Sequence, residues 1–306
     1  LTFVQYGREI MVTKTLLDGA LRFSIRAASV PWEAVCIPET EQSGSWSLKD
    51  LYCQDDTSGS IAARLLAARL GAVLDECNVV KARAPSVAPS SGKIVDHLEL
   101  KDEILLPQRI RLFRNRELPA DGTLLRKRGD AFVMSGGGCP VIVLTGDSAC
   151  VVAHASRESL LPKEFEEDGR PHEEHESVVE ASIRKLRELE PGLPLDRASL
   201  RVLFGITPKQ FRHPVHDSHH GPNNRGRQRY LSNRYGEEAM ANFIRDPEGE
   251  GYLDLNALTV HQARECGIEN AKTGSVLPAR GGFAHTRHPN PSLAKGRNLV
   301  VVHRLG

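Results

Sequence analysis

Residues 129–157, GDAFVMSGGGCPVIVLTGDSACVVAHASR, decide the fold of this chain. The pattern predicts a strand, a glycine turn, a second strand, a short polar turn and a third strand, followed by the start of a helix. Residues 141–144 and 151–153 are uninterrupted apolar runs, which are typical of buried strands. Cys139 opens the second strand and His154 closes the third. Because rigid scaffolds present chemistry at the ends of buried strands, we expect the active site here.

The rest of the chain alternates further strand and helix patterns and shows no internal repeat. Apolar runs predict the strands, and amphipathic stretches with capping residues predict the helices. This order is typical of an α/β protein, with mixed β-sheets flanked by helices in a single large domain. We expect strands at 20–26, 104–106, 110–113, 201–206 and 298–303, and helices at 60–74, 176–188 and 252–267.

Four segments are predicted to be loops. Residues 27–47 contain two prolines and a Gly-Ser cluster. Residues 81–93 are rich in Pro and Ser, residues 162–175 are acidic, and residues 212–235 are polar with several histidines and arginines. We expect the last three to be insertions that reshape or cover the mouth of the site.

Size and cysteine usage favour one intracellular domain. A chain of 306 residues is long enough for one large domain with a substantial core. We expect this domain to occupy 11–306, with residues 1–10 as an N-terminal extension or a cloning remnant. Six cysteines without a C-x-x-C spacing argue against a zinc ribbon and a disulfide framework, so reduced thiols are expected.

Charge and hydropathy argue against several function classes. The formal net charge of +1 disfavours a protein that binds nucleic acid through bulk electrostatics. No apolar run approaches the roughly 20 residues that span a bilayer, and charged residues within the first 20 argue against a signal peptide. We therefore expect a cytoplasmic protein without membrane or nucleic-acid partners.

The ordered pieces of 129–157 resemble the laccase-domain family, also called YfiH-type or polyphenol-oxidoreductase-like proteins. GDAFVM, GGGCPVIVL and VVAHASRE follow the order of the family phrases A-D-A-L-V-T, T-A-D-C with P-V-L-L, and H-A-G-W-R-G. Similar pieces occur at 23–31, 46–71, 252–268 and 281–305. The resemblance implies a YfiH-type fold and an enzyme that acts on purine nucleosides by phosphorolysis or deamination.

The resemblance also implies a site of two histidines and a cysteine that bind a metal, usually zinc, or act in catalysis. Cys139 and His154 match two of these positions. We place the remaining phrase, Q-V-H-G, on LPQRIRLF, which puts Ile110 at the first histidine. Catalytic zinc needs about three protein ligands, so zinc is expected only if another histidine completes the set. An alternative placement puts Ser148 at the cysteine but leaves almost no room for a strand before His154.

Roles for the matching residues follow from their chemistry. His154 suits a general acid or base because an unperturbed imidazole titrates near working pH. Arg26 and Arg287 match family arginines and would hold phosphate, since the guanidinium fork suits phosphate oxygens. The simpler alternatives are a structural histidine, a buried cysteine at a glycine turn and ordinary ion pairs. The partners implied by the resemblance are a nucleoside and phosphate.

A competing hypothesis is a catalytically inactive relative that serves as a binding or scaffold protein. Ile110 lacks a metal-binding group, and residues 156–159 replace the family phrase G-W-R-G. Turnover by the unmodified protein separates the two hypotheses. In space, Ile110, Cys139 and His154 should converge at one pocket if their placement is right.

Three other groups of residues have side chains that could bind a ligand or take part in catalysis. His213, His216, His219 and His220, with His285 and His288, have spacings that a metal could use, although histidines in such loop-like surroundings are usually solvated. The basic residues of 225–235 could touch RNA or phosphate, but a solvated face fits the overall charge better. Ser148, Asp147 and His154 suggest a triad, but adjacent Asp and Ser on one turn are poorly placed to flank one imidazole.

Overall fold

The structure is a computed structural model. It describes residues 4–6, 9–11, 13–15, 20–27, 30–38, 67–68, 79–82, 94–95, 102–106, 110–114, 120–206, 221–245, 252–277, 283 and 297–305.

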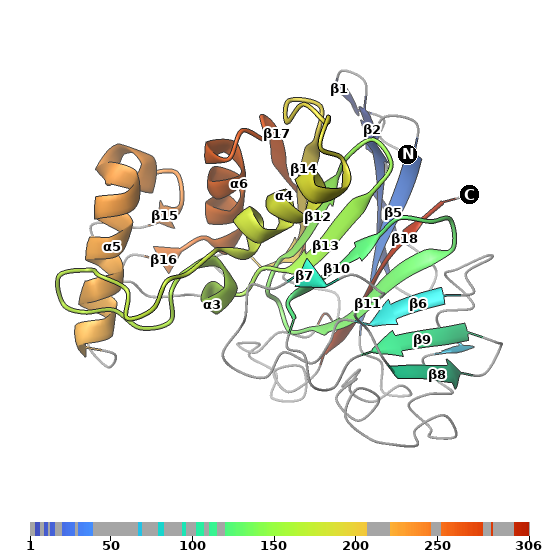
Figure 1. Ribbon diagram of the computed structural model, residues 1–306, viewed down its shortest axis with the longest axis horizontal. Helices are drawn as coiled ribbons and strands as arrows, with labels where there is room; N and C mark the ends of the chain where they lie inside the picture. Colours follow the sequence, from blue (N-terminus) through green and yellow to red (C-terminus); the bar gives the residue numbers. More distant parts are fainter. Residues whose placement is uncertain are drawn as a thin grey trace.

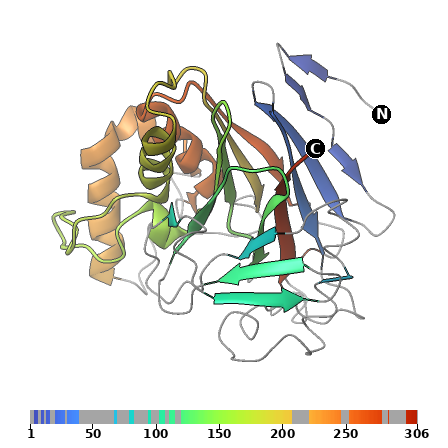
Figure 2. The same ribbon diagram turned by 45° about the vertical axis from the view of Figure 1, so that its right-hand side comes forward.

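Two mixed β-sheets and a layer of helices make up the described fold (Figure 1). The six-stranded sheet has the order β17-β14-β12-β13-β10-β7, and the eight-stranded sheet has the order β3-β4-β5-β18-β11-β6-β9-β8. Helices α4 and α6 cover the outer face of the six-stranded sheet (Figure 2). The strands of the first sheet are β7 (Ile94–Val95), β10 (Gly122–Leu125), β12 (Val141–Thr145), β13 (Cys150–His154), β14 (Ser199–Gly205) and β17 (Asn270–Val276). Those of the second are β3 (Thr13–Thr15), β4 (Leu21–Ala27), β5 (Val30–Ile37), β6 (Val79–Ala82), β8 (Asp102–Leu106), β9 (Ile110–Arg114), β11 (Asp130–Gly136) and β18 (Asn298–Arg304).

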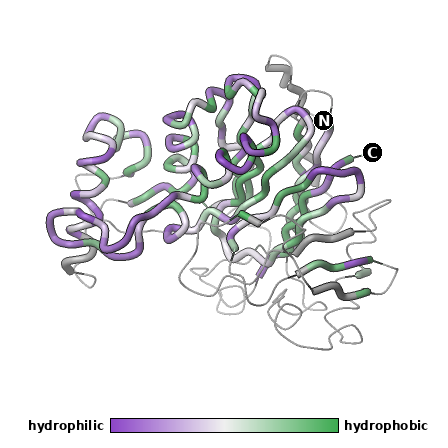
Figure 3. The backbone as a smooth tube through the Cα atoms, viewed as in Figure 1, coloured by the Kyte–Doolittle hydropathy of each residue, from purple (hydrophilic) through white to green (hydrophobic). Residues whose placement is uncertain are grey.

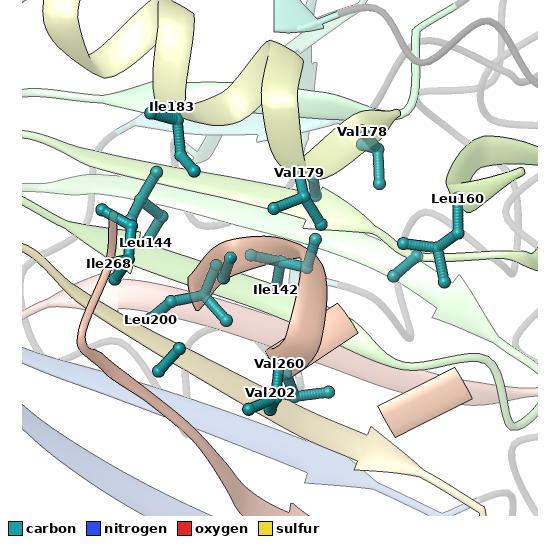
Figure 4. Packing of buried hydrophobic residues seen from close by; sticks show 14 of the residues in the cluster. Ile142, Leu144, Leu160, Val178, Val179, Ile183, Leu200, Val202, Val260 and Ile268 are labelled. Atoms are coloured by element: carbon teal, nitrogen blue, oxygen red, sulfur yellow. The ribbon is translucent and has the colours of Figure 1, made fainter. Parts of the chain in front are cut away.

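The two faces of the six-stranded sheet build two separate cores. Because side chains alternate along a strand, Val141 and Val143 face the eight-stranded sheet whereas Ile142 and Leu144 face the helices. Phe132 from β11 meets the first pair in the core between the sheets. Figure 4 shows the second core, where side chains of the sheet pack against those of α4 and α6. Burial on both faces explains the uninterrupted apolar runs in the sequence.

The stretch 129–157 forms the predicted strands and links the two sheets. β11 lies in the eight-stranded sheet, between β18 and β6, whereas β12 and β13 form a hairpin in the six-stranded sheet. The chain crosses from one sheet to the other through the glycine turn, where Gly138 has a φ of 102°. A positive φ favours glycine. The short helix α3 (Arg157–Leu160) follows, with Ser156 as its N-cap.

Two predicted helices are confirmed, and the structure shows a capping residue at the start of each. Helix α4 (Val178–Leu189) starts at a capping box in which Ser177 and Glu180 satisfy each other's backbone N–H groups. Helix α6 (Leu255–Glu265) starts at Asp254, whose side chain accepts a hydrogen bond from the backbone N–H of Ala257. The short strands β15 (Ile244–Arg245) and β16 (Tyr252–Leu253) pair just before α6, and β1 (Val4–Tyr6) pairs with β2 (Glu9–Met11) near the N-terminus.

The prediction of a loop at 27–47 is wrong for residues 30–37. These residues form β5, which pairs with β4 on one side and with β18 on the other. Pro31 lies at the start of the strand, a position where proline is tolerated, and its carbonyl accepts a hydrogen bond from Leu305. The remainder of β5 is buried, which outweighs the proline signal.

The prediction of a loop at 212–235 is wrong for residues 221–235. They belong to helix α5 (Gly221–Met240), which breaks at Gly236 where φ is 76°. The sequence pattern did not indicate this helix, because α5 lies beside the layers and buries few apolar side chains (Figure 1). Residues 162–175, named the arm from here on, form an exposed and largely hydrophilic excursion between α3 and α4, as predicted (Figure 3).

Several expectations fall wholly or partly outside the described residues. Lys81 and Ala82 belong to β6, so the start of the predicted 81–93 insertion is a strand. The helix expected at 60–74 is described only at Ala67 and Ala68, which are helical. Within the described residues, no helix is long and apolar enough to cross a membrane.

Candidate functional site

Several strands of the six-stranded sheet begin or end at the same end of the sheet, named the edge from here on. β13 ends there at His154, which pairs with Val141 at the start of β12, and Val141 pairs in turn with Leu203 near the end of β14. β10 starts at the same edge, because Gly122 pairs with Ala153. The turns that enter and leave these strands therefore lie side by side.

Asp121 and His154 meet at this edge. Nδ1 of His154 lies 3.8 Å from Oδ1 of Asp121, and the backbone N–H of His154 donates to the Asp121 carbonyl at 2.8 Å. The Asp121 side chain is fully buried, whereas 16% of the His154 side chain is exposed. At this distance the two side chains interact electrostatically, and Nδ1 is the ring nitrogen that faces the carboxylate. Nothing in the sequence pattern indicated this pairing, because it depends on the order of the strands in the sheet.

Cys139 reaches the same edge from the glycine turn. The pairing of the β12–β13 hairpin continues one residue beyond the strands, since the N–H of Ala155 donates to the Pro140 carbonyl at 2.9 Å. Cys139 directly precedes Pro140, so it lies at the same end of the hairpin as His154. The Cys139 thiol is partly exposed and forms no disulfide.

Ser148 lies at the opposite end of the hairpin. The carboxylate of Glu190 accepts hydrogen bonds from the backbone N–H groups of Asp147, Ser148 and Ala149, each at 2.8 Å, and from the Ser148 hydroxyl at 2.7 Å. Burial raises the pKa of Glu190, but these hydrogen bonds outweigh it and hold the pKa below its ordinary value. Ser148 therefore caps a turn, and a triad with His154 does not form.

Ile110 does not converge with Cys139 and His154. β9 runs parallel to β6, and β6 runs parallel to β11, so the register sets Ile110 level with the residue before Asp130. Cys139 follows the other end of β11, roughly 20 Å further along the sheet at about 3.3 Å per residue. The placement of the first family histidine on Ile110 therefore finds no support in the topology.

Several predicted residues have no described side chain. Arg26 pairs with Pro31 near the end of β4, but only its backbone is described. The other predicted phosphate ligand and the histidine groups lie outside the described residues: Arg287, His213, His216, His219, His220, His285 and His288.

The arginines of α5 are engaged with acidic groups of the protein itself. Arg225 pairs with Glu167 at 2.7 Å, and Arg234 pairs with Glu180 at 2.8 Å. Arg229 donates to the Glu167 carbonyl at 2.6 Å. These contacts favour a structural role for the basic residues over contacts with RNA or phosphate.

The backbone near this edge is strained at one position. Among the described residues, Phe204 in β14 is the only non-glycine residue with a positive φ, 58°. A Cβ at the next residue, Gly205, would collide with Asn256 and approach Pro140 to 2.9 Å. The Asn256 amide also donates to the Ile206 carbonyl at 3.2 Å. Such strain persists only where surrounding contacts determine the conformation, and it clusters at functional sites.

A second histidine, His175, approaches from the last residue of the arm. Its ring forms a hydrogen bond with the backbone of Ser159, whose hydroxyl donates to the His154 carbonyl at 3.1 Å. Burial lowers the pKa of His175 below its ordinary value, and the negative charges of Glu180 and Asp121 act against this shift. No pattern in the sequence indicated this placement, because it depends on how the arm folds back.

The described residues do not fit the zinc that the resemblance implies. No group of three His, Cys, Asp or Glu side chains within the described part of the chain has a geometry that could hold a metal ion. A catalytic zinc requires about three such ligands. Cys139 and His154 are therefore considered as acid–base or nucleophilic groups.

Comparison with known proteins identifies the fold. No family model matches the sequence, and no curated protein matches it. Among solved structures, the hypothetical protein YfiH of Bacillus licheniformis is 13% identical, with a TM-score of 0.57 over 95% of this chain and 98% of that one. The chain has the YfiH-type fold. YlmD from Geobacillus stearothermophilus is 13% identical (TM-score 0.53, 99% of this chain and 98% of that one), and a Neisseria meningitidis protein of the DUF152 family is 12% identical (TM-score 0.54, 97% and 99%).

The YfiH-type fold accounts for the architecture over nearly the whole length. The expected α/β class, with mixed sheets flanked by helices, is confirmed. The order of the short matches along the sequence, centred on 129–157, reflects this common fold.

Proposed function

We propose that this YfiH-type protein is an enzyme that acts on purine nucleosides, by phosphorolysis or deamination, with His154 as its general acid or base. The observation that carries the proposal is the buried Asp121 carboxylate beside His154, at the edge that Cys139 also reaches. An oriented imidazole at a strand end can move a proton at a defined point.

We assign the two ring nitrogens of His154 different tasks. Nδ1 faces Asp121, so Nε2 is the atom available to a substrate. In phosphorolysis, a phosphate oxygen bonds to C1′ of the ribose, the C1′–N9 bond breaks with its electrons on the purine, and a protonated imidazole donates a proton to the purine. In deamination, water adds to the base and ammonia leaves, which again requires proton transfer. We propose Arg26 and Arg287 as holders of phosphate in the first reaction.

The proposal is tested by incubating the protein with adenosine, inosine or guanosine, with and without phosphate, and separating the products by chromatography. Phosphate-dependent release of free base identifies phosphorolysis, and ammonia release without phosphate identifies deamination. His154→Ala should lower the rate at least about a hundredfold, because a positioned acid or base usually contributes that much. Ser148→Ala, at the far end of the same hairpin, is the matched control and should retain the rate. Absence of product from the unmodified protein would overturn the proposal.

A second candidate function is non-catalytic binding. It is favoured by residues 156–159, where the sequence departs from the family phrase G-W-R-G, and by the incomplete metal ligand set among the described residues. This candidate predicts nucleoside binding by calorimetry without any turnover, whereas measured turnover rules it out.

A further inference from the structure

Helix α6 carries two buried amide side chains, Asn256 and Gln262, of which only 5% and 3% are exposed. Each amide nitrogen donates to a main-chain carbonyl of another element. Each amide oxygen is buried and has no hydrogen-bond partner within the described residues. A buried polar atom without a partner costs free energy, so native proteins seldom retain one without a reason. Neither amide caps the helix, since Asp254 does so. Their role lies in the carbonyl groups that they hold.

Asn256 connects α6 with the glycine turn that carries Cys139. Its Nδ2 atom donates to the carbonyl of Ile206 at 3.2 Å, and the N–H of Ile206 donates to the carbonyl of Gly138 at 3.0 Å. Gly138 directly precedes Cys139 in the sequence. The end of β14 is therefore bonded to the helix on one side and to the glycine turn on the other.

The backbone between these two hydrogen bonds is strained and tightly packed. Phe204 has a φ of 58°, a conformation that a bulky residue keeps only where surrounding contacts impose it. Oδ1 of Asn256 lies so close to Gly205 that a Cβ there would collide with it, and the same Cβ would lie 2.9 Å from Pro140. Asn256 thus supplies both a hydrogen bond and a packing contact to this strained end of β14.

Gln262 forms the equivalent connection with His154. Its Nε2 atom donates to the carbonyl of Leu160, the last residue of α3, at 2.9 Å, and to the hydroxyl of Tyr235 at 2.9 Å. The hydroxyl of Ser159, next to Leu160 in α3, donates to the carbonyl of His154 at 3.1 Å. α6 is therefore linked to His154 through α3, as it is linked to Cys139 through β14.

We propose that Asn256 and Gln262 are positioning residues of the candidate site: Asn256 holds the turn that carries Cys139, and Gln262 holds the helix that follows His154. This inference rests on the proposed function, which it extends to a helix behind the site. Enzymatic rates are sensitive to displacements of about 1 Å at the reacting groups. The unsatisfied amide oxygens are the cost of placing two donors where the backbone of the site needs them.

Asn256→Asp and Gln262→Glu test the inference, because each keeps the shape of the side chain but replaces the donor with a carboxylate oxygen. Each variant should lower kcat by about tenfold to a hundredfold and change KM by less than about threefold, as expected for a displaced reacting group. A loss of folded protein alone would instead leave the kcat of the folded fraction unchanged.

Two further readouts need no turnover. Asn256→Asp should raise the rate at which iodoacetamide labels Cys139 by about fivefold, the effect of one lost hydrogen bond on local opening. Gln262→Glu should leave that rate unchanged, because Gln262 is linked to the other half of the site. It should instead shift the ring resonances of His154 in nuclear magnetic resonance spectra, which His154→Ala identifies.

Val260→Ala is the matched control. Val260 lies in the same helix and packs in the core between the six-stranded sheet and the helices, without a polar group in its side chain (Figure 4). This variant should lower the melting temperature while leaving kcat, Cys139 labelling and the His154 resonances unchanged. If Asn256→Asp does not fold, Asn256→Ala replaces it, since alanine removes the donor without adding a charge.

The outcomes separate this inference from the proposed function. Labelling of Cys139 that is unchanged in Asn256→Asp, or that rises equally in Val260→Ala, overturns the role of Asn256. Unshifted His154 resonances in Gln262→Glu overturn the role of Gln262, and an unchanged kcat in either amide variant does the same for that residue. Absence of turnover by the unmodified protein overturns the proposed function, whereas the labelling rates and the resonances still decide whether α6 holds the two segments.

Discussion

Nδ1 of His154 lies 3.8 Å from Oδ1 of Asp121, at the point where β13 and β10 leave the six-stranded sheet. The two residues are 33 positions apart in the sequence, and the antiparallel register of the two strands brings them side by side. The pair therefore depends on the sheet rather than on a flexible loop, so its geometry is set by the fold itself.

Asp121→Asn is predicted to lower nucleoside turnover by about a hundredfold, because a neutral amide does not supply the negative charge that the carboxylate places beside the imidazole. Steady-state kinetics on the purified variant measures the change. Circular dichroism should show an unchanged fold. Turnover equal to that of the unmodified protein would show that Asp121 acts only as a structural residue.

Cys139 is predicted to react with iodoacetamide well before Cys36 and Cys150. Its thiol is partly exposed, whereas burial raises the pKa of Cys36 and Cys150 and keeps them as unreactive thiols. Peptide mass spectrometry after short labelling of the native protein gives the order of reaction. A bound nucleoside should slow labelling of Cys139. Equal labelling of all three in the folded state would contradict the burial of the two strand cysteines.

Glu190→Gln is predicted to lower the free energy of unfolding at pH 7 by about 1–3 kcal/mol, because a charged acceptor of several hydrogen bonds is lost. Since the pKa of Glu190 is lowered in the folded state, its contribution is present above the unfolded pKa and is lost as the pH falls through the folded pKa. Urea unfolding at pH 7 and pH 3.5 should show a smaller difference between variant and unmodified protein at the lower pH. A difference independent of pH would contradict this account.

Phe132→Ala is predicted to destabilise the fold by about 3–5 kcal/mol, because it opens a cavity in the core between the sheets. Leu105→Ala is the control, since 62% of Leu105 is exposed on the edge strand β8, and it should change stability by less than about 0.5 kcal/mol. Denaturant unfolding of both variants measures the difference. Similar values for the two would mean that Phe132 is not a core residue.

Local sequence signals predicted the elements that bury apolar runs or carry standard caps. Residues 129–157 and α4 are examples, because residues close together in the sequence determine their burial and capping. β5 was missed because Pro31 and the following Gly-Ser cluster resemble a loop, although long-range pairing with β18 decides its structure. α5 was missed because few of its side chains are buried and apolar, while its contacts with the arm join residues far apart in the sequence.

The candidate site was predictable only in part, because long-range pairing of strands brings some of its residues together. Cys139 and His154 belong to one hairpin, so local spacing sufficed to bring them together. Asp121 joins them through strand order, which has no local signature. Ile110 was misplaced because it begins β9, which runs parallel to β6 and β11, so it lies level with the start of β11, whereas Cys139 follows the end of β11.

The last described strand, β18, lies between β5 and β11 in the middle of the eight-stranded sheet. During synthesis, β5 and β11 are made before β18, so each keeps one hydrogen-bonding edge unpaired until β18 follows. Such edges recruit strands from other chains. Loss of β18 would therefore divide the sheet into two parts with open edges, and the nascent chain needs chaperones most before β18 has formed.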